Sequence, residues 1–147
     1  MIPELSCVSR KQEPLVLAVE DNEDNLLVIS YVLESLNCRF LAKTNGFDIV
    51  KIVKKYRPNL ILMDIILPDI NGIDIFYQLQ EDPLTSFIPV VAMTALAMTE
   101  EIQKIQKAGF HACITKPYML EELEEMIIQQ LKQTRITPQC QIIQQQV

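Results

Sequence analysis

Acidic, hydroxyl and ammonium side chains stand directly after four short apolar runs of this 147-residue chain. Each of them alone has an ordinary explanation, as a helix-start acid, a turn former, a strand-end hydroxyl or a solvated base. If the four runs are neighbouring parallel strands, however, their carboxyl ends meet at one edge of a sheet and the side chains converge there. The residues are Glu20 and Asp21 after the first run, Asp64 after the second, Thr94 after the third and Lys116 after the fourth.

This combination of side chains predicts a particular chemistry. Three carboxylates within about 5 Å of one another repel by roughly 3 kcal/mol per pair at an effective dielectric of 20, so a cation must lie among them. Oxygen ligands favour Mg²⁺, which commonly bridges carboxylates to a phosphoryl group. A lysine and a hydroxyl facing that ion would complete a phosphoryl clamp. Asp64, which follows the apolar residues Leu60 to Met63, is then the candidate nucleophile.

The apolar runs have the length and flanks of β-strands. The runs that begin at Leu15, Leu60 and Ile88 are apolar throughout, as is typical of parallel strands covered on both faces. The run beginning at Arg39 starts with a charge, which indicates an edge strand. The predicted strands are Leu15–Val19, Arg39–Ala42, Leu60 to Asp64, Ile88–Met93 and Ala112–Thr115.

Amphipathic stripes between these runs predict five helices. Asn22 is a suitable N-cap for the first, and Gly109 is a natural end for the fourth, whose thin apolar stripe predicts a loosely held element. Five repeats of strand and helix predict an α/β fold, a doubly wound parallel sheet with helices on both faces. The stripes are Leu26, Ile29, Leu33 and Leu36; Ile49, Ile52, Val53 and Tyr56; Ile73, Phe76 and Leu79; Ile102, Ile105 and Ala108; and Leu120, Leu123, Ile127 and Leu131.

Composition limits the classes of protein to which the chain can belong. A hydrophobic content of 49% supplies the core of one domain, predicted over residues 14–132, between a flexible N-terminal arm (1–13) and a Gln-rich C-terminal tail (133–147). Thirteen bases against nineteen acids give a net charge of -6, which argues against nucleic acid and anionic membranes as partners. No apolar run approaches the roughly 18 residues that span a bilayer, so we expect a cytoplasmic protein.

Taken together, the motifs resemble the receiver domain of bacterial two-component response regulators. The resemblance covers about residues 14–132 and implies the flavodoxin-like receiver fold with strand order 2-1-3-4-5. It rests on Val19-Glu20-Asp21-Asn22, Met63-Asp64-Ile65-Ile66-Leu67-Pro68 with Gly72, Met93-Thr94-Ala95 and Thr115-Lys116-Pro117.

The resemblance also implies a role for each site residue. Asp64 would accept a phosphoryl group from the phosphohistidine of a sensor histidine kinase or phosphotransfer protein. Thr94 and Lys116 would contact the phosphoryl oxygens, and the Lys116-Pro117 bond would be cis. The Mg²⁺ ligands would be Glu20, Asp21, Asp64 and the backbone carbonyl of Ile66.

The same resemblance makes the chain a phosphoacceptor signalling protein and not a turnover enzyme, with at most self-phosphotransfer and self-dephosphorylation. With no fused output domain, its signal is expected to leave by contact with a downstream protein.

Two positions depart from the receiver pattern. Cys113 stands where an aromatic residue usually lies, three residues before the lysine, and the apolar Ile66 lies two residues beyond the acceptor. Cys113 leaves open the alternative of a phosphorylation-independent interaction scaffold. The sequence also leaves open a phosphorelay intermediate, since it does not show whether Asp64 is an end point or a relay stop. A haloacid dehalogenase-type phosphatase would need a carboxylate at Ile66. An FMN binder would be repelled by the acids at 20–24.

Overall fold

A five-stranded parallel sheet forms the centre of the molecule. The computed structural model describes residues 13–96 and 98–135. Its strands lie in the order β2-β1-β3-β4-β5 and every neighbouring pair is parallel, which confirms the predicted fold class and strand order. The strands are β1 (Leu15–Val19), β2 (Arg39–Lys43), β3 (Leu60–Asp64), β4 (Val90–Thr94) and β5 (Ala112–Thr115).

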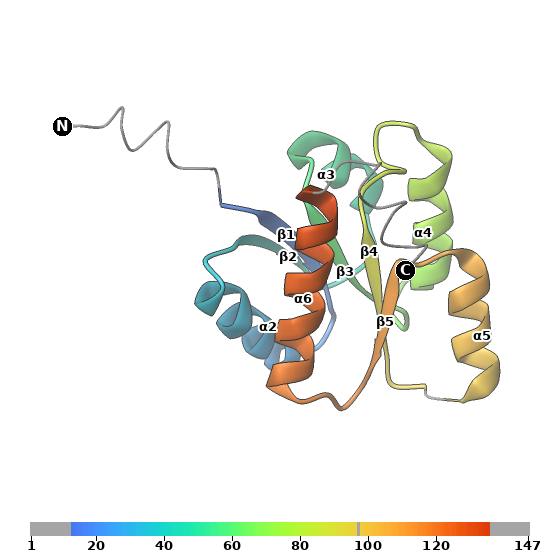
Figure 1. Ribbon diagram of the computed structural model, residues 1–147. Coiled ribbons are helices and arrows are strands. Elements are labelled where there is room, and N and C mark those ends of the chain that lie inside the picture. The colour runs from blue at the N-terminus through green and yellow to red at the C-terminus, as the bar shows by residue number, and fades with distance from the viewer. Residues whose placement is uncertain (1–12, 97, 136–147) are drawn as a thin grey trace, which may run out of the picture.

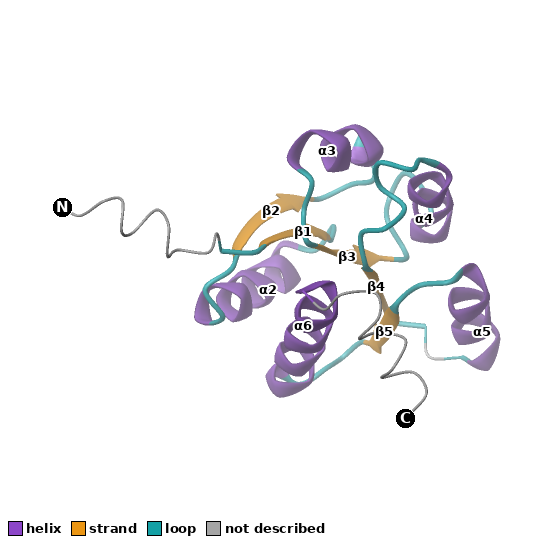
Figure 2. Ribbon diagram, turned by 45° about the horizontal axis from the view of Figure 1, so that its top comes forward, coloured by secondary structure: helices purple, strands orange, loops and turns teal. Residues whose placement is uncertain are grey.

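Five helices cover the two faces of the sheet (Figures 1 and 2). Helices α2 and α6 pack on one face, and α3, α4 and α5 pack on the other. This arrangement places a helix between each pair of consecutive strands, as the alternating sequence pattern predicts. The helices are α2 (Glu23–Ser35), α3 (Ile49–Tyr56), α4 (Gly72–Glu81), α5 (Thr99–Ala108) and α6 (Leu120–Arg135).

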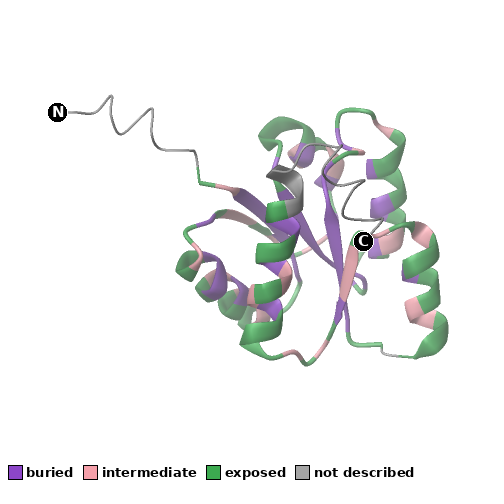
Figure 3. Ribbon diagram, viewed as in Figure 1, coloured by how far each residue is buried: buried purple, intermediate pink, exposed green. Residues whose placement is uncertain are grey.

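The three central strands are buried along their whole length (Figure 3). Successive side chains of β1 point to opposite faces, so Val16 and Ala18 pack with α2 and α6 while Leu17 and Val19 pack with α3 and α4. Strands covered on both faces need apolar side chains on both, which explains their unbroken apolar runs. By contrast, β2 lies at the sheet edge and is partly exposed, as its initial charge predicts.

Several element boundaries differ from the sequence-based expectation. Strand β4 begins at Val90 instead of Ile88, because Pro89 has no N–H group to donate to a neighbouring strand. Strand β2 continues to Lys43, whose carbonyl accepts the Glu20 N–H (2.9 Å). Helix α6 extends to Arg135, past the domain boundary predicted at residue 132.

The structure describes little of the predicted N-terminal arm and C-terminal tail. The predicted arm and tail lie almost wholly outside the described residues, which exclude 1–12 and 136–147. Within the described part of the chain, no helix is long and apolar enough to cross a bilayer.

Helix α5 buries a single residue, Ile105, consistent with its thin apolar stripe.

Candidate functional site

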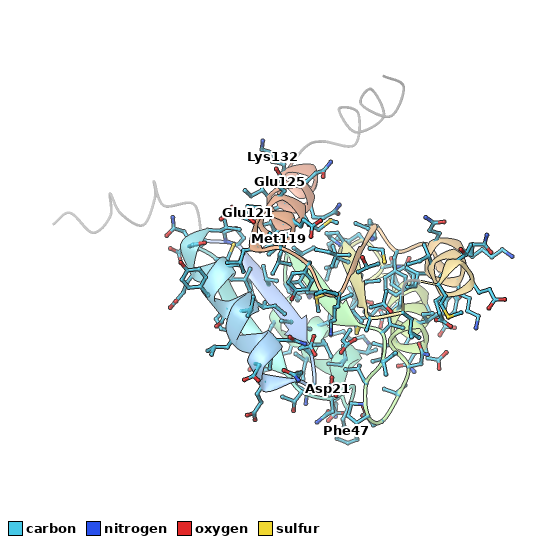
Figure 4. All side chains as sticks on the ribbon, turned by 90° about the horizontal axis from the view of Figure 1, so that it is seen from below. Asp21, Phe47, Met119, Glu121, Glu125 and Lys132 are labelled. Carbon is cyan, nitrogen blue, oxygen red and sulfur yellow. The ribbon has the colours of Figure 1, made fainter. Side chains whose placement is uncertain are left out.

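The carboxyl ends of β1, β3, β4 and β5 lie side by side at one edge of the sheet. Val19 pairs with Met63, Asp64 with Met93 and Thr94 with Thr115, so the residues that follow these strands enter the same region. Figure 4 looks onto this edge, where Asp21 is labelled. The site residues predicted from the sequence therefore gather where open parallel sheets bind their ligands.

Three carboxylates form an acidic cluster at this edge. One oxygen from each of Glu20, Asp21 and Asp64 lies within 4.8 Å of the others. Glu20 is fully buried, Asp64 is 4% exposed and Asp21 is exposed. The turn from β1 into α2 fixes Glu20, because its Oε2 accepts the N–H of Asn22 (3.1 Å), the residue that caps α2.

Lys116 brings a positive charge into the cluster. Its Nζ lies 2.7 Å from Glu20 Oε1 and 3.4 Å from Asp64 Oδ2. Its backbone N–H donates to the Thr94 carbonyl (2.8 Å), and its peptide bond to Pro117 is cis, as the receiver resemblance implies. Burial alone would lower the pKa of Lys116, but the hydrogen bond to Glu20 and the two carboxylate charges raise it. The ammonium group therefore stays charged and offsets part of the cluster's negative charge.

This arrangement changes the protonation of Asp64. Its burial, together with the charge of Glu20, raises its pKa to about 7, against the opposing effect of Lys116 and of the Ile66 N–H. That N–H donates to Asp64 Oδ1 (3.3 Å). A carboxyl with a pKa near 7 gains strongly from any further cation, since a cation favours its ionised form.

The acidic cluster fits a magnesium ion by its donor chemistry. Its three side chains offer only oxygen atoms, which a hard cation prefers, and they come from two strand ends that the sheet holds side by side. Lys116 supplies one positive charge against three carboxylates, so negative charge remains for a divalent ion to balance. Glu20, Asp21 and Asp64 would hold the ion. The backbone carbonyl of Ile66 remains a predicted fourth ligand.

Thr94 is near these residues but does not join the cluster. It is fully buried at the end of β4, and its hydroxyl accepts the N–H of Leu96 (3.0 Å). Within the described residues, the structure therefore brings Glu20, Asp21 and Lys116 to Asp64, while the Thr94 hydroxyl is engaged in its own loop. This orientation is a matter of side-chain rotamer, which the sequence pattern does not specify.

The loop after β3 is built around Gly72. The Gly72 N–H donates to the carbonyl of Ile65 (2.8 Å), and Asn71 caps α4 through the N–H of Ile73 (2.7 Å). A Cβ atom on Gly72 would lie 2.5 Å from the carbonyl oxygen of Asp64, so only glycine lets α4 begin this close to the strand end. Ile66, on the same loop, exposes about half of its side chain.

A second contact holds this loop from the side, and the sequence reasoning missed it. Asp69 Oδ1 accepts the N–H of Gly46 (2.9 Å), which joins the loop after β3 to the loop between β2 and α3. A Cβ on Gly46 would lie 2.3 Å from Ile70, so the two loops are closely packed. The partners are 23 residues apart and follow no motif, so sequence spacing carried no signal of their contact.

Cys113, in place of the usual aromatic residue, packs beneath the site. It is half-buried against Ile65, Ala92 and Ile105, and its burial raises the pKa of its thiol. The ring of Phe110 packs against the same cluster as Cys113. Tyr118, two residues after Lys116, packs against the core cluster that includes α6. Burial also raises the pKa of the Tyr118 hydroxyl.

Comparison with known families gives a direct match. Residues 16–128 match the family model described as the response regulator receiver domain. The polar-differentiation response regulator DivK of Brucella anthropi is 35% identical over 112 residues, which cover 76% of this chain and 91% of that protein.

Solved structures agree with this match. The receiver domain of a sensor histidine kinase of Pseudomonas aeruginosa, solved with magnesium in its active-site cleft, superposes with a TM-score of 0.75 at 27% identity. It covers 82% of this chain and 99% of that one. The signal receiver domain of a histidine kinase of Syntrophus aciditrophicus gives a TM-score of 0.78 at 25% identity, covering 84% and 94% of the two chains.

Proposed function

Since the chain belongs to the response regulator receiver domain family, we propose that it acts as a response regulator whose phosphoacceptor is Asp64. The phosphoryl group would come from a phosphohistidine on a sensor histidine kinase or a phosphotransfer protein. The proposal is based on one observation. Glu20, Asp21 and Lys116 lie around Asp64, the carboxylate at the end of the central strand β3.

In the proposed reaction the Asp64 carboxylate is the nucleophile. One of its oxygens attacks the phosphorus of the phosphohistidine, the P–N bond breaks as the P–O bond forms, and the departing imidazole nitrogen takes up a proton from solvent. The product is an acyl phosphate on Asp64. The reaction needs the ionised carboxylate, and a bound Mg²⁺ would favour that form against the burial and the Glu20 charge that raise the pKa of Asp64.

The surrounding residues hold charge in place for this step. Glu20 fixes the Lys116 ammonium at 2.7 Å, which leaves that ammonium within reach of both Asp64 and an incoming phosphoryl oxygen. Bound Mg²⁺ would neutralise charge on the carboxylates and on the phosphoryl oxygens. Asp21 is exposed and would present its carboxylate to the ion from the solvent side.

Thr94 would convert phosphorylation into a change of shape. If its hydroxyl turns from the Leu96 N–H toward a phosphoryl oxygen, that N–H loses its acceptor and the loop from β4 to α5 rearranges. Helix α5 follows that loop directly and buries only Ile105, so it can shift at small cost. With Cys113 in place of an aromatic ring, this loop and helix movement would carry the signal to a downstream protein.

The alternatives remain a phosphorylation-independent scaffold and a relay that passes the group onward. The test of the main proposal is incubation with Mg²⁺ and acetyl phosphate followed by intact mass measurement. We expect one added phosphoryl group, absent in Asp64→Asn and retained in Asp74→Asn, which removes an exposed acid of α4. An unmodified wild-type protein that also binds no Mg²⁺ would support the scaffold.

A further inference from the structure

A basic helix stands out on this acidic molecule. Residues 49–57, which form α3 and its C-cap, contain four bases and no acid. The remainder of the chain therefore has nine bases against nineteen acids, a net charge of -10. The four bases are Lys51, Lys54, Lys55 and Arg57, all exposed.

Three of the four charges of this helix remain available to a partner. Lys54 pairs with Asp82 at the end of α4 (2.6 Å). For Lys51, Lys55 and Arg57, no acid of the described residues lies within ion-pair distance. The ammonium of Lys55 lies 5.1 Å from the centre of the Tyr56 ring, which presents a cation and an aromatic face together.

Exposed apolar side chains lie on α3 itself and on the loop after α4, whose first residue, Asp82, pairs with Lys54. Tyr56 is 46% exposed at the end of α3, Leu84 is 46% exposed and Phe87 is 68% exposed. Asp82 joins the two groups, since it accepts the N–H of Leu84 (2.9 Å) while it pairs with Lys54. We call Lys51, Lys54, Lys55, Tyr56, Arg57, Leu84 and Phe87 the α3 surface.

The α3 surface extends away from the phosphorylation site. Helix α3 starts after β2 at the Asp64 edge of the sheet and ends before β3 at the opposite edge. Figure 1 shows α3 and the loop after α4 at the top, and the loops after β4 and β5 at the lower end of the sheet. The proposed phosphoryl transfer leaves the residues of the α3 surface without a role.

We propose that the α3 surface binds an acidic segment of a partner protein, one with an apolar stripe that covers Tyr56, Leu84 and Phe87. The charge of Lys51, Lys55 and Arg57 complements acidic side chains, and the apolar residues supply the contact that a partner must bury. Nucleic acid fits less well, because a long polyanion would run beyond this short patch onto a molecule of net charge -10 elsewhere.

The termini of this chain do not supply the complement. Residues 136–147 contain no acid, and residues 1–12 contain one acid and two bases. A second copy could offer the exposed acids Glu121 and Glu125 of α6, but the copy as a whole is a folded domain and not an acidic segment with an apolar stripe. A separate protein with an acidic amphipathic segment is therefore the partner that the surface fits.

The test uses the full chain and two synthetic helical peptides with the same leucine stripe. One peptide carries glutamate at its polar positions and the other carries glutamine. We expect the acidic peptide to shift the backbone amide NMR signals of residues 49–57 and 82–88, and the glutamine peptide to bind about tenfold more weakly. The double variant Lys51→Glu, Lys55→Glu should weaken the acidic peptide at least about tenfold.

Matched variants separate the α3 surface from net charge. Lys104→Glu, Lys107→Glu changes the net charge equally on exposed lysines of α5 and should bind as the wild type does. Phe87→Ser should weaken binding, whereas Leu27→Ser, at an exposed apolar residue of α2, should not. Phosphorylation of Asp64 should proceed in all four variants, so its failure would concern the proposed function and not this surface.

Three results would overturn the proposal. The first is equal weakening by the α3 and α5 charge reversals, or shifts that map to another surface. The second is tighter binding of a short DNA duplex than of the acidic peptide at residues 49–57. The third is a concentration-dependent shift of the same signals without peptide, which would assign the surface to a second copy of the chain.

Discussion

Lys116 lies closer to Glu20 than to Asp64, with Nζ to oxygen distances of 2.7 Å and 3.4 Å. Because Glu20 is fully buried, its charge depends on this partner for compensation. The lysine thus has a structural task in addition to its proposed contact with the phosphoryl group.

The first prediction concerns removal of this lysine. Lys116→Ala should lower the free energy of unfolding by about 2 to 4 kcal/mol, because it leaves the buried Glu20 carboxylate without its cation. Urea denaturation at pH 8 measures this change. Lys107→Ala, on the exposed side of α5, is the control and should change stability by less than about 0.5 kcal/mol. Equal stability of wild type and Lys116→Ala would contradict the role of the pair.

The second prediction follows from the raised pKa of Asp64. The folded protein holds this proton up to about pH 7, while the unfolded chain releases it near 3.8, so without Mg²⁺ stability should fall as pH rises between these values. Asp64→Asn should lose this dependence and be more stable at pH 8, by on the order of 2 kcal/mol. Mg²⁺ should raise the wild-type melting temperature at pH 8. A wild-type profile parallel to that of Asp64→Asn would contradict the assignment.

The third prediction tests the close approach at Gly72. A Cβ would meet two backbone atoms, the Asp64 oxygen at 2.5 Å and the Ile65 Cα at 2.9 Å, and neither can rotate away. Gly72→Ala should therefore cost about 1 to 3 kcal/mol of stability and slow phosphorylation by acetyl phosphate.

Gly109→Ala provides the control for this change. Gly109 has φ 101° and only ordinary contacts to the Phe76 ring, so alanine should cost about 1 kcal/mol there without affecting phosphorylation. If both variants accept phosphoryl groups at the wild-type rate, the packing of Gly72 does not position Asp64.

The fourth prediction uses the only histidine of the chain. His111 Nδ1 accepts the Val90 N–H (3.1 Å), and partial burial lowers the pKa of His111 below 6.5. The contribution of this group is present above pH 6.5 and is lost as pH falls below it, because the unfolded chain takes up the proton first. Its single imidazole signal in NMR should titrate below 6.5. In Asp64→Asn, which lacks the opposing pH dependence of Asp64, the further change His111→Gln should flatten the stability profile between pH 5 and 7. A midpoint above 6.5 would exclude the proposed effect.

Much of the fold was predictable because burial on both faces leaves a simple pattern. An apolar run such as Leu15–Val19, followed by a helical stripe, is best interpreted as a buried strand of an α/β fold. In such a fold the carboxyl ends of neighbouring parallel strands lie at the same edge of the sheet. The strand order came from the family resemblance and not from the runs themselves. The start of β4 was predicted wrongly at Ile88. Pro89 lies within the apolar run but has no N–H group for strand pairing, and hydrophobicity alone does not show this.

The convergence of the acidic residues and Lys116 on Asp64 was predictable, whereas several of the surrounding contacts were not. Residue type and position placed Glu20, Asp21 and Lys116 beside Asp64. The direction of the Thr94 hydroxyl depends on a rotamer, and the bond from Asp69 to Gly46 joins two loops that share no motif. Such contacts depend on three-dimensional packing, which spacing along the chain does not encode.

The resting position of Thr94 has a consequence for signalling without a kinase. One neutral hydrogen bond, to the Leu96 N–H, keeps the hydroxyl in its loop, and such a bond contributes about 1 kcal/mol net. A bond of this size holds the hydroxyl only weakly, so thermal motion can break it without a phosphoryl group. We therefore expect a basal output from the unphosphorylated protein, and removal of this bond should change its level.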